Sequence, residues 1–208
     1  MPEHFLSLAR NARDKVAFQL KTSVEICILA GGQSSRMGRN KSQLRLGGKT
    51  LLAHIRRTAK TLNFPVRTIR RDLVPRCGPL GGVYTALKTT SADAVLFLAC
   101  DMPLVSGALL EKLLQYFKNG CAIFTWSNDA AGFPLVLSRD AIPTVEKLLA
   151  KKQFSMQALA TKTHAKKFRP GRVFKSDLLN INTSEDWMEL KKVFSKRAKS
   201  TQEAWLVN

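Results

Sequence analysis

The residues best placed to do chemistry gather in one stretch, Gly31–Lys41, that directly follows an apolar run at 26–30. An apolar run that ends at two glycines predicts a buried strand followed by a tight turn. Glycine lets backbone N–H groups approach a ligand closely, and Arg36 and Lys41 add positive charge. These residue types indicate a cradle for a polyphosphate, although the spacing matches neither G-x-G-x-x-G nor G-x-x-x-x-G-K-[ST]. The alternative is a tight turn with exposed cations.

A second candidate is Asp101, which follows the apolar run AVLFLA at 94–99. A carboxylate at the end of a buried strand is expensive to desolvate unless it is paired or bound to a metal. Mg²⁺ typically takes one or two carboxylates together with substrate phosphate oxygens and water. We therefore predict that Asp101 is a Mg²⁺ ligand and that, with the cationic loop, it supports transfer at a phosphorus atom. The alternative is a turn or cap aspartate ahead of Met102-Pro103.

The chain contains five motifs in a fixed order: LAGGQSSRMGRNK at 29–41, CGPLGGVYTAL at 77–87, LACDMPL at 98–104, FPLVL at 133–137 and NINTSED at 180–186. Together they resemble the MobA-like nucleotidyltransferases, and the resemblance covers about residues 24–193. The first is similar to that family's signature L-A-G-G-x-S-x-R-M-G-x-D-K. GPLGG followed late by NINT most resembles the molybdenum cofactor guanylyltransferases, which join GMP from GTP to molybdopterin and release pyrophosphate.

The resemblance implies a role for each matching position. The implied catalytic residues are Arg36, Lys41 and Asp101, of which Asp101 would bind Mg²⁺. The implied nucleotide-binding residues are Leu29, Ala30, Gly31, Gly32, Lys41, Asp72, Gly78, Pro79, Leu80 and Asp101. Asn180 and Asn182 would line the acceptor side, and the alternative for these two asparagines is a cap or turn role.

The sequence departs from the family pattern at two places. Asn40 stands where the family usually has aspartate, which removes a negative charge beside Lys41. The span 51–78 is also short, and it lacks a counterpart to the family's nucleotide-contacting asparagine. Either the second strand is 66–69 with a trimmed loop, or recognition of the base is altered.

The elements that must position these residues follow from periodicity. Strands are predicted at 24–30, 66–69, 94–99, 121–126 and 133–137, with weaker ones at 164–168 and 173–174. Helices are predicted at 50–62, from the GPLGG turn to 87, at 106–117, 141–150 and 155–161, and from 184 to about 195. This alternation predicts a largely parallel sheet covered on both faces, which binds ligands at the carboxyl ends of its strands. With the resemblance, the expected fold is α/β, a Rossmann-like three-layer αβα sandwich of the nucleotide-diphospho-sugar transferase type.

Length and composition predict one domain at 23–195, preceded by a helical extension at 1–22 and followed by a basic tail at 196–208. The four cysteines form no CxxC pair, which argues against zinc and fits reduced thiols. No apolar run approaches the length of a membrane span, and the first 20 residues do not resemble a secretory signal. We expect a cytoplasmic protein without a membrane partner.

The net charge of +19 indicates an anionic partner but does not choose its class. The resemblance implies GTP and molybdopterin as substrates and Mg²⁺ as cofactor, with transient contacts to cofactor-synthesis proteins or molybdoenzymes. One alternative is a related enzyme that uses CTP or another phosphate acceptor. Another is a basic nucleotide- or nucleic-acid-binding protein that has lost the chemistry. Nucleic acid is disfavoured because the sequence shows no aromatic-rich basic platform.

Overall fold

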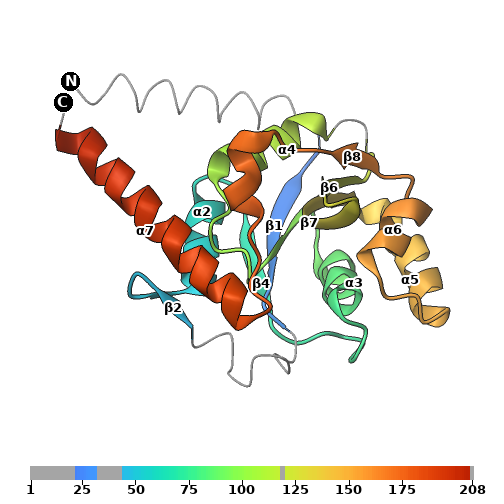
Figure 1. Cartoon of the computed structure of the whole chain (residues 1–208). Helices are drawn as coiled ribbons and strands as arrows, with labels where there is room; N and C mark the ends of the chain where they lie inside the picture. The colour runs from blue at the N-terminus through green and yellow to red at the C-terminus, as the bar shows by residue number, and fades with distance from the viewer. Residues whose placement is uncertain (1–21, 32–43, 118–119, 207–208) are drawn as a thin grey trace.

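A computed structural model describes residues 22–31, 44–117 and 120–206, and its centre is a six-stranded sheet (Figure 1). The strand order is β4-β1-β5-β7-β6-β8. The strands are β1 Val24–Leu29, β4 Val66–Ile69, β5 Ala94–Ala99, β6 Ile123–Ser127, β7 Ala130–Ser138 and β8 Lys166–Phe168. A separate hairpin pairs β2 Arg45–Leu46 with β3 Lys49–Thr50.

The sheet is mostly parallel. Strand β1 runs parallel to β4 and β5, with Ile26 opposite Val66 on one side and Leu96 on the other. Strand β7 is antiparallel to both β5 and β6, and β8 returns parallel to β6. The carboxyl ends of β4, β1, β5, β6 and β8 therefore meet at one edge of the sheet.

Helices cover both faces of the sheet, which confirms the predicted three-layer αβα sandwich. They are α2 Leu51–Lys60, α3 Pro79–Thr89, α4 Gly107–Tyr116, α5 Ile142–Ala150, α6 Met156–Lys162 and α7 Ser184–Leu206, with 3₁₀ turns η2 Arg139–Ala141 and η3 Arg172–Leu178. Along β1, Ile26 and Ile28 pack with α2 and α4, whereas Cys27 and Leu29 pack with α3. Figure 1 shows α3, α5 and α6 together on the side away from α2. Burial on both faces explains why β5 is a continuous apolar run and why β1 is apolar from Ile26 onward.

The last helix is longer than predicted, because α7 continues past residue 195 to Leu206. Its apolar residues pack in a third core cluster that includes Leu46, Leu104, Ile181 and Leu190. Arg197, which the sequence places in a polar tail, donates to the carbonyl oxygen of Leu104 over 2.9 Å. Residues 1–21 of the predicted N-terminal extension lie outside the described residues.

Three local predictions are wrong, each for a physical reason. Val173 and Phe174 lie in η3 and not in a strand, because Phe174 packs against the core from a 3₁₀ turn. The predicted loop at 127–132 is only a two-residue turn, in which Asn128 and Asp129 both adopt positive φ angles. The β2–β3 hairpin is missed because its strands are two residues long, too short to show alternation, although Gly47-Gly48 between them is a turn signal.

The predicted thiol state and the start of the helix predicted at 106–117 agree with the structure. All four cysteines are free, and burial raises the pKa of the Cys27 thiol to about 12. Ser106 is the N-cap of that helix and accepts a hydrogen bond from the backbone amide of Leu109. Within the part of the chain that the structure describes, every helix is too short or too polar to cross a bilayer.

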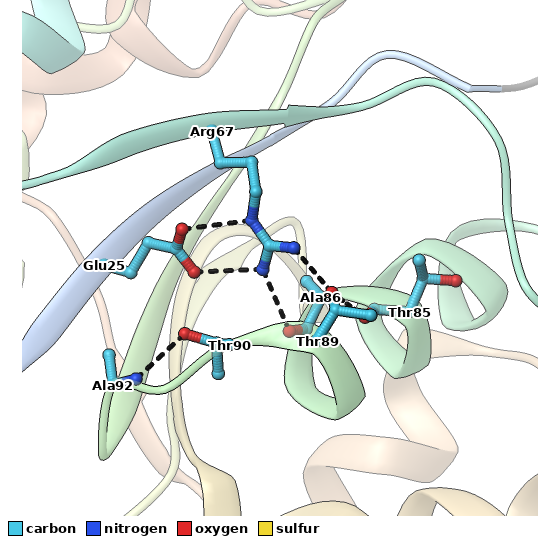
Figure 2. Close-up of polar contacts among 7 residues, drawn as sticks. All are labelled: Glu25, Arg67, Thr85, Ala86, Thr89, Thr90 and Ala92. Carbon is cyan, nitrogen blue, oxygen red and sulfur yellow. Dashed lines mark hydrogen bonds and ion pairs between the residues drawn. The ribbon is translucent and has the colours of Figure 1, made fainter.

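At the amino edge of the sheet, Arg67 of β4 ties β1 to the end of α3 (Figure 2). Its guanidinium donates two parallel hydrogen bonds of 3.0 Å to the carboxylate of Glu25. It also donates to the carbonyl oxygen of Ala86 over 3.1 Å and to the hydroxyl of Thr89. The Glu25 side chain is only 15% exposed, so this pair is largely shielded from water.

We predict that Arg67→Met destabilises the fold by about 1–3 kcal/mol, because it leaves the Glu25 carboxylate shielded from water without its partner. The free energy of unfolding from urea titration measures the loss. Lys88→Met is the matched control, because the Lys88–Glu146 pair is more exposed, at 42% and 44%. It should leave the unfolding midpoint almost unchanged. Equal losses in the two variants would contradict a special role for Arg67.

Candidate active site

A cleft of about 1780 Å³ opens at the carboxyl edge of the sheet. The ends of β1, β5 and β6, the start of β7, the turn before α3 and η3 all contribute to its lining. Of the residues predicted from sequence, seven line it: Leu29, Gly31, Asp72, Gly78, Pro79, Asp101 and Asn180. The structure thus brings together residues that lie up to 151 positions apart in the chain.

The other predicted residues lie elsewhere. Leu80 lies in the first turn of α3, where its side chain is fully buried in the core and does not line the cleft. Ala30 is half-buried, and its amide donates to the carbonyl oxygen of Ile69 over 2.8 Å. Asn182 is exposed and does not belong to the lining. The loop residues Gly32, Arg36, Asn40 and Lys41 lie outside the described residues.

The first turn of α3 contains Gly81 and Gly82, and their lack of side chains leaves room for Asp72. A Cβ at Gly81 would lie 2.8 Å from the Val74 carbonyl oxygen and 3.0 Å from Oδ2 of Asp72. A Cβ at Gly82 would lie 3.1 Å from Leu29 of β1. The last two glycines of the GPLGG motif, Gly81 and Gly82, therefore let both β1 and the Asp72 segment approach the first turn of the helix.

Gly78 and Thr85 complete this half of the cleft. Gly78 caps α3 with a φ of 55°, a left-handed value that favours glycine, and Pro79 follows at the first helical position. The buried Thr85 hydroxyl accepts from the Leu73 amide over 2.8 Å and donates to the Gly81 carbonyl oxygen. The segment that carries Asp72 is thus fixed to α3. The positive end of the helix dipole points toward the cleft, which favours an anionic ligand there.

The Asp72 carboxyl is partly desolvated in this position. Burial raises the pKa of Asp72 above its ordinary value. The shift disfavours the charged form, so the folded protein loses stability when Asp72 ionises. A carboxylate held at such a cost beside a cleft is a candidate for ligand binding.

Asp101 leaves β5 in a pair of tight turns at the middle of the cleft. The Met102 amide donates to the carbonyl oxygen of Ala99, and the Val105 amide donates to that of Met102, each over 3.3 Å. The amide of Ile181 donates to the carbonyl oxygen of Asp101 over 3.0 Å. This bond holds the segment of the cleft residue Asn180 directly against the Asp101 turn.

The donor set at Asp101 fits Mg²⁺ better than a metal that takes all its ligands from protein side chains. Within the described residues, no group of three His, Cys, Asp or Glu side chains could hold a metal ion. Mg²⁺ needs only one or two carboxylates, because substrate phosphates and water supply the remaining ligands. Asp101 is half-buried and lines the cleft, so its carboxylate suits that partial ligand role.

The far half of the cleft contains residues that the sequence did not single out. Trp126 comes from β6, and the ammonium of Lys167 lies 4.4 Å from its ring centroid. Arg169, Arg172 and Lys175 line the same half from the end of β8 and from η3. The rule that ligands bind after strand ends could have found Arg169, but the predicted strand at 173–174 concealed the turn that follows β8.

Asn182 belongs to the cap of α7 through its backbone. The Asp186 carboxylate accepts from the amides of Asn182 and Thr183 over 2.8 and 2.9 Å. The Thr183 hydroxyl accepts in return from the Asp186 amide over 3.2 Å. This reciprocal arrangement is a capping box, and it accounts for the NTSED part of the last motif.

The chain matches known proteins over most of its length. The family model of the MobA-like NTP transferase domain matches residues 26–70 and 56–166. The molybdenum cofactor guanylyltransferase of Syntrophotalea carbinolica is 30% identical over 184 residues, which cover 77% of this chain and 87% of that protein. The same-named protein of Xanthomonas euvesicatoria is 30% identical over 177 residues, covering 78% and 92%.

A solved structure supports the fold. Molybdopterin-guanine dinucleotide biosynthesis protein A from Archaeoglobus fulgidus superposes with a TM-score of 0.72 at 21% identity, covering 83% of this chain and 99% of that one. The family-model match spans well over half of the chain, and relatives at 30% identity are covered almost end to end. The chain therefore belongs to the MobA-like NTP transferase family and is a nucleotidyltransferase.

Proposed function

We propose that this enzyme transfers GMP from GTP to the phosphate of molybdopterin in a Mg²⁺-dependent reaction. An oxygen of the acceptor phosphate forms a bond to the α-phosphorus of GTP. The bond from that phosphorus to the bridging oxygen of the β-phosphate breaks, and pyrophosphate leaves with the electron pair. The proposal is supported by a cleft whose lining includes Asp72 after β4, Asp101 after β5, and Asn180, whose neighbour Ile181 bonds the Asp101 turn. The names of the relatives supply the substrates.

The nucleotide would bind on the side of β1 and α3. A carboxylate can accept two hydrogen bonds from the edge of guanine, which presents N1–H and an exocyclic amino group next to each other. Asp72 is the carboxylate that lines this side, and the glycines beside it leave the backbone accessible. Cytosine presents one amino group there and no neighbouring N–H, so an aspartate favours guanine. We assign Arg36 and Lys41 to the phosphates, where their charge would stabilise departing pyrophosphate.

Asp101 would hold the metal. When bound, Mg²⁺ would neutralise phosphate charge and help to orient the α-phosphate. The contribution of the protein is to keep the Asp101 carboxylate in place, through the turns at Met102 and Val105 and the bond from Ile181. Positioning of this kind is most of what a protein supplies in phosphoryl transfer.

The acceptor would enter from the other side, past Asn180. The lining there includes Arg169, Arg172 and Lys175, which attract an anionic acceptor. Trp126 offers a flat apolar surface in the same half, and a pterin ring could stack on it. The charges of the cleft therefore suit two anionic substrates.

The reaction itself can be tested by measuring pyrophosphate release with each NTP, molybdopterin and Mg²⁺. We expect turnover with GTP and at most about one-hundredth of that rate with CTP, because a mispaired polar group in the base site costs several kcal/mol. Preferred use of CTP would support the alternative enzyme. Inactivity with every nucleotide, together with steeply salt-dependent binding to RNA, would favour the binding-protein alternative.

Asp101→Ala should lower kcat by about 100-fold or more while the protein stays folded, because the metal would lose its protein ligand. Asp140→Ala is the matched control. Asp140 of η2 is exposed, its carboxylate accepts a hydrogen bond from the Ser138 hydroxyl, and it does not line the cleft. Circular dichroism checks the fold of both variants. Full activity in Asp101→Ala would remove the metal assignment.

Asp72→Asn should change stability and GTP binding in opposite directions, and the change in stability depends on pH. Burial raises the pKa of Asp72, so wild-type stability falls as the pH rises from the ordinary aspartate range through the folded-state pKa. The asparagine variant should lack this loss and melt at the same or a higher temperature at pH 7, yet bind GTP more weakly.

Asp93→Asn is the control of opposite sign. The hydroxyl and amide of Ser23 donate to the Asp93 carboxylate and lower its pKa. That carboxylate stabilises the fold above the ordinary aspartate range, and the contribution disappears as the pH falls through its folded-state pKa. Asp93→Asn should therefore lower the melting temperature at pH 7 and leave GTP binding unchanged. A lower melting temperature for Asp72→Asn at pH 7 would contradict the assignment of Asp72.

A further inference from the structure

A buried carboxylate lies behind the cleft, outside the residues assigned above. Asp177 of η3 is only 3% exposed, and among the residues whose burial the structure describes it is the only charged one that is buried. Such a group is costly unless it is fully paired. Asp177 accepts from the Ser106 amide over 3.0 Å, from the Ser106 hydroxyl and from Nη2 of Arg197 over 2.6 Å.

The second partner, Arg197, reaches past Asp177 to the Asp101 turn. Its Nη1 donates to the carbonyl oxygen of Leu104 over 2.9 Å, and its Nη2 also donates to the Ser176 hydroxyl. Leu104 lies three residues after Asp101 and is buried. One guanidinium on α7 therefore binds the chain that leaves Asp101, and it also binds η3, which precedes Asn180.

The same segments also meet through apolar packing and one backbone bond. Leu104 and Ile181 share the third core cluster with Leu190 of α7. The Ile181 amide donates to the carbonyl oxygen of Asp101 over 3.0 Å. The Asp101 turn, the Asn180 segment and α7 thus form one packed unit, and Arg197 with Asp177 is its polar centre.

We propose that Arg197 and Asp177 form a latch that sets the position of Asp101 relative to Asn180, and so aligns the metal side of the cleft with the acceptor side. The proposal rests on the proposed function, in which these two residues serve those sides. Arg197 and Asp177 are positioning residues, because the cleft lining includes neither of them. They act on the reaction through the backbone that they hold.

The latch predicts an effect on turnover that is separate from nucleotide binding. The nucleotide side is built by Leu29, Gly31, Asp72 and the start of α3. Arg197 instead donates to Leu104, Ser176 and Asp177, which belong to the Asp101 turn and to η3. Small misplacements of reacting groups cost large factors in rate. Loss of the latch should therefore lower kcat and leave the affinity for GTP nearly unchanged.

The test compares Arg197→Met, Arg197→Lys and Arg67→Met. Arg67→Met removes an arginine from an ion pair at the opposite edge of the sheet and controls for lost stability. With pyrophosphate release measured well below the melting temperature, Arg197→Met should lower kcat about 10- to 100-fold and change the KM for GTP less than about 3-fold. Arg197→Lys should be intermediate, because lysine keeps the charge but not the planar fork. Arg67→Met should keep the wild-type kcat.

Two results would overturn the latch. One is a wild-type kcat in folded Arg197→Met. The other is equal kinetic losses in Arg197→Met and Arg67→Met, which would reduce Arg197 to a general contribution to stability.

A readout without substrate separates this proposal from the proposed function. Amide hydrogen exchange should quicken at 101–106 and 180–181 in Arg197→Met and stay unchanged at 79–83. Unchanged exchange at 101–106 would overturn the latch even if GTP is the substrate. Faster exchange at 101–106 in Arg197→Met would support the latch even if the wild-type protein proved inactive with GTP. Inactivity of the wild type would refute only the proposed function.

Discussion

Strands β1 and β5 are buried on both faces, and this burial determines where charged groups can lie. Helices cover both faces of these strands, so the side chains in their middle must be apolar. Charges therefore concentrate at the strand ends, and the two edges of the sheet differ. At the amino edge Glu25 is paired with Arg67, which ties β4 and α3 to β1. At the carboxyl edge Asp101 is half-buried and lines an open cleft, where a ligand can reach it.

The sequence predicted the site best where the chain folds locally. The run before Asp101, the N-cap at Ser106 and the glycines at 81 and 82 all lie in or beside elements that their own periodicity reveals. Whether residues 66–69 form the second strand was an open question, and β4 answers it by pairing with β1 just ahead of Asp72. The span is short because helix, strand and return turn follow each other with few intervening residues.

Long-range contacts and turn geometry were beyond prediction. Arg197 looks like one more cation in a basic tail, because its partners lie 20 to 93 positions away. Leu80, assigned to nucleotide binding from its motif, points into the core, since it follows Gly78 and Pro79 into the first turn of α3. Trp126 looked like an ordinary strand residue. The antiparallel placement of β7 beside β6 brings it to the cleft, and strand order cannot be read from periodicity alone.

The two halves of the cleft are held by different kinds of contact. Asp72 packs at Gly81, its segment is anchored by Thr85, and the strand before it pairs with β1. Asn180 is held next to Asp101 by a backbone bond that spans 80 positions and by contacts from α7, which lies beyond the part that the family model matches. A change in η3 or α7 can therefore alter the Asn180 side of the cleft without disturbing the packing of Asp72. In the proposed function these are the acceptor side and the nucleotide side, so the two substrates would be selected independently, and the Asp101 turn would be the point where the two selections must agree.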